Sequence, residues 1–170
     1  TRRAVDCALD TAFGYHLLQT GCSRGHALFA SSPINHRIYA AERPGPGVNL
    51  LALAGELPLE SDSIDTVIAH HTLDFARNPH QVLREIQRVL TPQGHLLIVG
   101  FNPHSLLGVN ARVRGLSRKS LWHQHTWVSE SRLTDWLRLL GCEVQDRSRI
   151  GVAPLLGGGT LRRWLTRLDD

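Results

Sequence analysis

The chain has 170 residues, of which 42% are hydrophobic and 20% are charged. This length and balance predict one globular domain over residues 1–170 with a real core, and exclude a disordered chain. No apolar run approaches the roughly 20 residues that span a bilayer, and no signal peptide is visible, so we expect a cytoplasmic protein without a membrane partner. The formal net charge of +4 alone leaves a nucleic-acid partner open.

Cysteine and methionine usage adds two expectations. Cys7, Cys22 and Cys142 form no C-x-x-C arrangement, so we interpret them as buried, reduced thiols. The sequence contains no methionine, not even an initiator. We therefore expect that Thr1 is not the native start and that the termini are trimmed.

The first segment, Thr1 to Tyr15, predicts an amphipathic helix. Val5, Leu9 and Phe13 recur at helical spacing, so one face of this segment is apolar. Such a helix can lie across a sheet or over the mouth of a pocket.

Residues 57–103 predict a strand, a helix and a second strand. The apolar runs at 64–68 and 95–100 have the length and composition of buried strands. Between them, Asn78 can cap the start of a helix, and Gly94 predicts its end in a left-handed turn. Two strands joined through a helix should be parallel neighbours with a right-handed crossover.

The C-terminal third predicts a further helix and strand. Ser129 can cap a helix whose apolar stripe ends at Gly141, and residues 142–150 alternate as a half-exposed strand does. Thr160 to Leu168 has the composition of a last short helix.

The strings LPLESDSID at 57–65 and LREIQRVLTPQG at 83–94 carry the strongest pattern of the chain. They resemble the class I S-adenosylmethionine-dependent methyltransferases, and within them the type 11 group of mostly small-molecule enzymes. The positions that agree are Leu57, Pro58, Ser63, Asp65, Leu83, Glu85, Arg88, Val89, Leu90, Pro92 and Gly94.

This resemblance implies a three-layer, Rossmann-like α/β methyltransferase fold. Its mainly parallel sheet should run in the order third, second, first, fourth and fifth strand, with a sixth beyond near Val144 and helices on both faces. The final strand of the family has no candidate after Ile150. We therefore expect an incomplete sheet, with the region beyond Ile150 either mobile or completed by a partner chain, of which a homodimer is one form.

The resemblance also assigns the first strand and its glycine loop to His16–Gly25, followed by a helical stretch from His26 to Ser31. Gly21, Cys22 and Gly25 then fall at positions where the family binds S-adenosylmethionine. Small residues there let the backbone approach the cofactor closely.

Two positions of this loop depart from the family pattern. Ser23 replaces the middle glycine, and Gln19 stands where the family carries an acidic residue that helps to hold the methionine amino group. As a plain sequence pattern, the loop also fits an ordinary strand-to-helix turn.

Glu42 is the best single candidate for a cofactor residue. It ends the second strand about 20 residues past the glycine loop, where a carboxylate can accept both ribose hydroxyls. Prolines and glycines at 43–47 predict that no helix follows, so the fold is shortened after strand two. Leu53 and Ala54 end the next short strand, where Leu53 can wall the adenine without hydrogen-bonding it. We expect an open adenine side and modest affinity.

His70 and His71 follow the fourth strand, where the family contacts cofactor and substrate. We interpret His71, and second His70, as a catalytic base, with Asp74 as an orienting partner and His70 as a further cofactor contact. The alternative is that one His packs under the next helix and the other faces solvent. His123 and His125 form the other pair, and nothing nearby completes a metal site, so we predict none.

These features favour an S-adenosylmethionine-dependent methyltransferase acting on a small-molecule acceptor. The alternative is a degenerate methyltransferase fold kept as a binding or interaction module, which Gln19, Ser23 and Leu53 favour. A nicotinamide-dependent oxidoreductase is excluded because His26 stands where the third glycine is required. Arginines and Lys119 within 106–125 could bind an acidic partner, but a solvated basic loop is the plainer interpretation and we do not expect nucleic acid.

Overall fold

The computed structural model describes residues 5–7, 9, 14–21, 27–101 and 128–145. A five-stranded sheet forms their centre, with the strand order β3-β2-β1-β4-β5. All four pairings between neighbouring strands are parallel. The strands are β1 (His16–Gly21), β2 (His36–Ala41), β3 (Leu50–Leu51), β4 (Ile64–His70) and β5 (Leu90–Val99). The predicted order of the first five strands is therefore confirmed, including the parallel contact of the runs at Val67 and Leu97.

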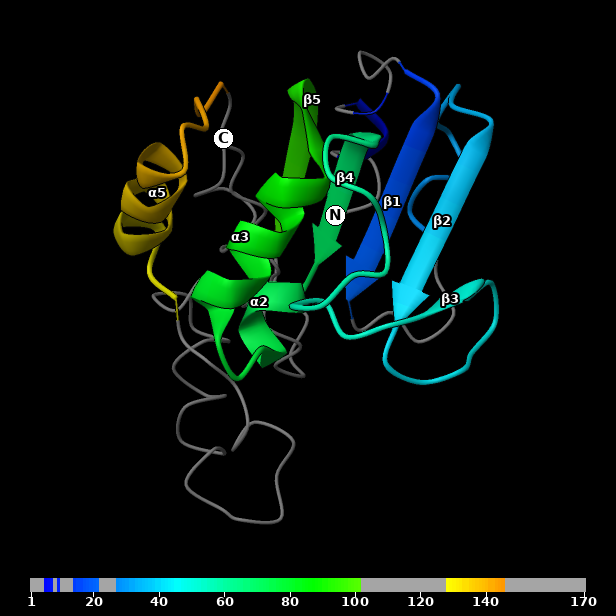
Figure 1. Ribbon diagram of the computed structural model, residues 1–170, viewed down its shortest axis with the longest axis horizontal. Coiled ribbons are helices and arrows are strands. Elements are labelled where there is room, and N and C mark those ends of the chain that lie inside the picture. The colour runs from blue at the N-terminus through cyan, green and yellow to red at the C-terminus, as the bar shows by residue number, and fades with distance from the viewer. Residues whose placement is uncertain (1–4, 8, 10–13, 22–26, 102–127, 146–170) are drawn as a thin grey trace, which may run out of the picture.

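Alternating side chains along the strands give the sheet two apolar faces. Leu18 and Val67 face one side, where they join the cluster that includes α3 (Pro79–Val89) and α5 (Glu130–Leu139). In Figure 1, α3 covers one face of β4 and β5, with α5 beside it. Leu17, which precedes Leu18, and Ile68, which follows Val67, face the other side of the sheet. The apolar cluster on that side consists of Val5, Leu9, Leu17, Leu28, Ile34 and Ile68. The fold is thus the predicted α/β arrangement with helical residues on both faces.

The N-terminal prediction is confirmed for the residues that the structure describes. Residues 5–7 and 9 are helical, and Val5 and Leu9 are almost fully buried beside Leu17 and Ile68. Because these contacts involve the centre of the sheet, this segment lies across the sheet. No helix of the described chain is long and apolar enough to cross a membrane.

The capping predictions for the two long helices are also confirmed. The Asn78 carboxamide oxygen accepts a hydrogen bond from the Gln81 N–H at 3.3 Å, at the start of α3. The Ser129 hydroxyl accepts one from the Arg132 N–H at 3.4 Å, at the start of α5. Gly141 follows α5 with φ of +78°, a backbone conformation that favours glycine.

The turn predicted at the end of α3 is wrong in its detail. β5 begins at Leu90 instead of His95, and its pairing with β4 jumps between Ile64–Leu90 and Thr66–His95, which marks a bulge. Gly94 is not in the left-handed region. A glycine is needed there for space, because a Cβ would lie 2.7 Å from the Leu90 side chain and 2.9 Å from the Asp65 carbonyl oxygen.

The helical stretch predicted from His26 to Ser31 is also wrong, since the described residues 27–31 contain no helix. The reason is length. A six-residue strand is about 20 Å long, and a helix that runs back along it needs about 13 residues. Only about 14 residues lie between Gly21 and His36. Such a helix would therefore leave almost no residues for the two turns that connect it to the strands.

The strand predicted near Val144 is not formed in the part that the structure describes. Residues 142–145 are irregular, and residues 146–150 lie outside the described residues, as does the predicted helix from Thr160 to Leu168. An alternating pattern reports which side chains could be buried, whereas a strand also needs a neighbour for its backbone groups. The single-domain and homodimer expectations stay predictions.

The two strings of the family pattern meet in one polar network. The Glu85 carboxylate accepts a hydrogen bond from the Leu57 N–H at 2.8 Å and contacts Arg88 at 2.7 Å. The Arg88 guanidinium also donates to the carbonyl oxygens of Leu57 and Leu59 at 3.1 and 3.0 Å. These residues therefore fasten the segment before β4 to α3, which is a structural role.

A second contact fixes the carboxyl ends of β1 and β4. Gly21 has φ of +122°, and a Cβ on it would lie 2.0 Å from the His70 carbonyl oxygen and 2.6 Å from the Thr72 hydroxyl. Thr72 opens the short helix α2 (Thr72–Phe75), and its buried hydroxyl donates to the Thr20 carbonyl at 2.8 Å. Only a residue without a side chain allows this approach.

Replacing Glu85 with Gln should lower the free energy of unfolding by about 1–2 kcal/mol at pH 7, because a charged hydrogen bond to a partly exposed Arg88 is lost. The Arg88 hydrogen bond lowers the pKa of Glu85 from its ordinary value of 4.5. The contribution should therefore be complete above about pH 4.5 and disappear as the pH falls through the lowered pKa. Urea unfolding across this range measures it. The exposed Glu60→Gln serves as the control, and an equal loss in both variants would contradict the assignment.

Replacing Gly21 with Ala should lower the free energy of unfolding by more than about 2 kcal/mol, because of both the backbone strain and the clash with the His70 carbonyl. The matched control is Gly45→Ala, whose new Cβ would lie 3.7 Å from Val48 without a strained φ. Thermal unfolding of the two variants makes the comparison. Equal midpoints would show that β1 and β4 do not depend on this glycine.

Candidate functional site

The candidate site lies where the parallel strands end. In Figure 1 the arrowheads of β1, β2 and β4 point to the same edge of the sheet. Gly21 of β1 is level with His70 of β4, and His70 is level with Val99 of β5. In open parallel sheets this carboxyl edge is where ligands bind. The structure therefore brings Gly21, His70 and His71 together, as the sequence predicted.

Glu42 stands one residue beyond the end of β2, on the same edge. Thr20 is level with Ala40, so Glu42 stands close to the level at which β1 ends at Gly21. The side chain is exposed, and no hydrogen bond joins its carboxylate to another described residue. Residues 43–49 contain no helix, which confirms the shortening predicted after strand two. These observations fit a carboxylate that receives ligand hydroxyls, a role that stays a prediction.

The adenine side predicted for Leu53 and Ala54 is open. β3 has two residues and ends at Leu51 instead of at the predicted Leu53 and Ala54, and Leu53 then forms an isolated bridge with Glu56. The Leu53 side chain is 52% exposed, whereas Ala54 packs against the core. An exposed leucine can supply an apolar wall, and its side chain cannot form a hydrogen bond to an adenine.

Gln19, one of the two departures from the family pattern of the glycine loop, has a structural role. Its side chain is fully buried, and its carboxamide oxygen accepts a hydrogen bond from the Leu28 N–H at 2.7 Å. The residue at the family's acidic position thus holds the chain that leads to β2. Cys22, Ser23 and Gly25 lie outside the described residues.

His71 and Asp74 form the most organised polar contact of the edge. The His71 Nδ1 lies 2.7 Å from Asp74 Oδ2, and the same oxygen accepts a hydrogen bond from the Phe101 N–H at 3.1 Å. Asp74 is 5% exposed and the His71 side chain 19%. The predicted pairing of His71 with Asp74 is therefore confirmed as a contact, while the catalytic role stays a prediction.

Two aromatic rings hold the His71 imidazole in place. The Phe101 ring stacks on it with 4.1 Å between centroids, and the His70 ring meets it edge-on at 4.6 Å. The sequence analysis did not single out Phe101. Its position directly after the strand at 95–100 was the available signal, because residues at that point reach the carboxyl edge.

Asp65, which belongs to the family pattern, lies at the opposite edge. Its carboxylate accepts hydrogen bonds from the N–H groups of Tyr15 and His16 at 2.7 and 2.9 Å. It therefore anchors the start of β1, and it takes no part in the candidate site.

The described residues contain no group of three or more side chains that could hold a metal ion. His123 and His125 lie outside the described residues, as does the basic segment 106–125. The prediction that the cysteines are buried is wrong for Cys7, which is exposed on its helical segment. Cys142 is half-buried, and burial raises the pKa of its thiol.

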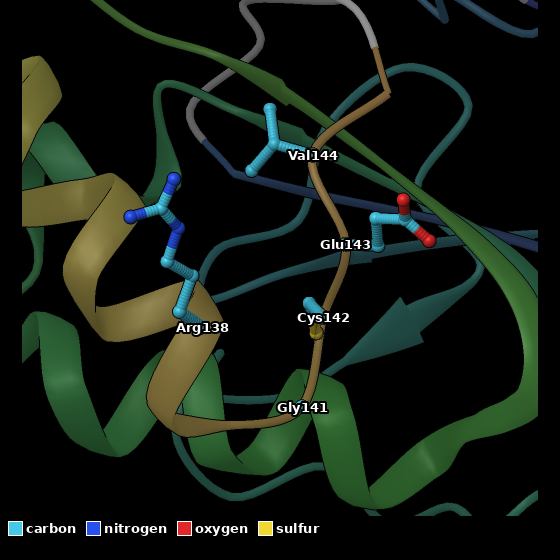
Figure 2. A pocket seen from close by; sticks show the side chains of 5 residues that line it. All are labelled: Arg138, Gly141, Cys142, Glu143 and Val144. Atoms are coloured by element: carbon cyan, nitrogen blue, oxygen red, sulfur yellow. The ribbon is translucent and has the colours of Figure 1, made fainter.

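Hollows also occur away from the candidate site. Figure 2 shows one at the end of α5, lined by Arg138, Gly141, Cys142, Glu143 and Val144. Another, at the amino edge of the sheet, is lined by Gly14, Tyr15, Asp65 and residues 91–93. Neither hollow is lined by a residue of the candidate site. The candidate site is instead placed at the carboxyl ends of the strands, where the polar contacts converge.

Comparison with known proteins identifies the family of this chain and supports its fold. Residues 9–98 match the family described as "Methyltransferase domain". An uncharacterized protein of Escherichia coli, YafS, is 34% identical over 157 residues, which are 90% of this chain and 65% of that protein. The chain thus spans about two thirds of the length of this relative, and YafS carries no assigned activity.

Solved structures agree on the fold. A SAM-dependent methyltransferase of Thermotoga maritima, described as a possible histamine N-methyltransferase, superposes with a TM-score of 0.64 at 22% identity, covering 83% of this chain and 70% of that one. A SAM-dependent methyltransferase of Aquifex aeolicus superposes with a TM-score of 0.58 at 16% identity, covering 85% and 81%.

Proposed function

Because the chain belongs to the class I methyltransferase domain family, we propose that it binds S-adenosylmethionine at the carboxyl edge of its sheet and methylates a small-molecule acceptor. The observation that carries the proposal is the position of Glu42, one residue beyond the end of β2 at the carboxyl edge of the sheet, with an exposed carboxylate that receives no hydrogen bond from a described residue. A carboxylate at that position suits two neighbouring ribose hydroxyls.

Several residues of the edge would hold the cofactor. Gly21 keeps the end of β1 free of side-chain atoms, Glu42 would accept the ribose hydroxyls, and Leu53 would cover one face of the adenine. From their positions in the sequence, Cys22 and Gly25 would add backbone contacts, and Ala54 and His70 would line the remaining wall. The cofactor supplies an electrophilic methyl group, and its leaving group departs neutral without help from an acid.

The protein's contribution is then mainly alignment. Holding two reactants in the correct geometry can lower a barrier by up to about 7–11 kcal/mol. A base is needed only for an acceptor that must lose a proton, and His71 or His70 would serve there.

The second candidate is a methyltransferase fold that binds a partner without catalysis. It is favoured by the Gln19 side chain, which is fully engaged within the protein at the position where the family holds the methionine amino group. The two candidates differ in one measurable property, the binding of the cofactor.

Replacing Glu42 with Ala should weaken binding of S-adenosylhomocysteine by about 1.5–3 kcal/mol, roughly 10- to 150-fold, because hydrogen bonds to a charged group are lost. Isothermal titration calorimetry on the wild type and the variant measures this difference. Glu60→Ala removes the same charge from an exposed position before β4 and should leave binding unchanged. If the wild type did not bind S-adenosylhomocysteine at millimolar concentration, the proposal of an enzyme would be rejected in favour of the non-catalytic binding module.

The open adenine side sets the expected strength of binding. Because β3 has two residues and no helix follows Glu42, much of a bound adenine should stay in contact with water. We expect a micromolar dissociation constant for S-adenosylhomocysteine in the same calorimetry. A nanomolar value would show that the adenine is enclosed.

A further inference from the structure

One carboxylate oxygen links the ends of two strands at the candidate site. Asp74 Oδ2 lies 2.7 Å from His71 Nδ1, just after β4, and 3.1 Å from the Phe101 nitrogen, just after β5. An oxygen that accepts a backbone N–H is best suited to accept from the imidazole as well.

The backbone of His71 is held as firmly as its ring. Its N–H donates to the Val99 carbonyl oxygen at 2.7 Å, and its φ of +55° is a left-handed conformation that residues with a Cβ rarely adopt. Strained conformations of this kind persist where the surroundings fix them, and they gather at functional sites. With Phe101 stacked on the ring, the direction of both ring nitrogens is set before any ligand arrives.

We propose that Asp74 is a positioning residue that fixes the proton of the His71 ring on Nδ1 and so keeps Nε2 ready to accept a proton from an acceptor hydroxyl. This inference rests on the proposed methyl transfer. Among the described residues, the hydrogen bonding of the His71 ring involves Asp74 alone, which leaves Nε2 for a ligand.

A hydroxyl is the acceptor that gains most from such a base, because it keeps its proton at neutral pH. In the step that His71 performs, the O–H bond breaks, the electron pair stays on the oxygen, and the proton passes to Nε2. The resulting imidazolium charge faces the Asp74 carboxylate, and the proton later leaves to water. The titratable groups that face His71 from the described elements are Asp74 of α2 and His70 of β4.

The test is the tautomer of His71, observed by ¹H–¹⁵N nuclear magnetic resonance of the imidazole in the ¹⁵N-labelled protein near pH 8. The signal is assigned by its absence from His71→Gln. We expect the Nδ1–H tautomer in the wild type. In Asp74→Leu a side chain of similar size offers Nδ1 no acceptor, so the proton is no longer held on Nδ1 and a large share of the ring should change to the Nε2–H tautomer.

The control is Asp62→Asn, which removes an exposed carboxylate at a residue whose positive φ suits asparagine, and it should leave the His71 signal unchanged. A wild-type ring in the Nε2–H tautomer would overturn the proposal even if Asp74→Leu failed to fold. A folded Asp74→Leu with the wild-type tautomer would overturn it too. The measurement uses neither cofactor nor acceptor, so its result is distinct from a failure of cofactor binding.

Discussion

The close approach of β1 and β4 at their carboxyl ends is the constraint on which the rest of the site depends. Gly21 has no side chain, and the His70 carbonyl occupies the space that a Cβ would need. The same approach lets the Thr72 hydroxyl reach the Thr20 carbonyl, which fixes the start of α2. One missing side chain therefore sets how closely the end of β1 approaches His70 and the start of α2.

Farther along the sheet, Asp74 makes the corresponding connection between β4 and β5. Its buried carboxylate accepts a hydrogen bond from the Phe101 N–H after β5 and contacts the His71 ring after β4. The Glu85–Arg88 pair acts at a distance from this edge and fastens the segment before β4 to α3. The residues that define the family pattern thus build the support, while the candidate chemistry depends on residues outside that pattern.

This division explains how much could be predicted from the sequence. The strand order followed from the family resemblance, and the helix caps were predictable because Asn78 and Ser129 act within one turn. Asp74 was predicted as an orienting partner for the histidines that follow the fourth strand, and the structure places it against His71. The stacking of Phe101 on His71 was not predictable, because it depends on the register between β4 and β5.

The predictions that were wrong or incomplete also have physical causes. Gly94 was interpreted as a turn glycine, yet it is needed for room beside Leu90 and Asp65, a contact that no local pattern reveals. The helix expected at 26–31 follows the family and ignores the short distance in sequence between Gly21 and His36. Gln19 was recognised as a departure, but its bond to the Leu28 N–H required coordinates.

The central claim is that the carboxyl edge of the sheet is the ligand site. Backbone ¹H–¹⁵N spectra of the labelled protein, recorded as S-adenosylhomocysteine is added, test it most directly. The account predicts shifts at Gly21, Glu42 and His71 that saturate together, with no change at Tyr15 and His16 on the opposite edge. Shifts confined to that opposite edge, or to the hollow at the end of α5, would contradict it.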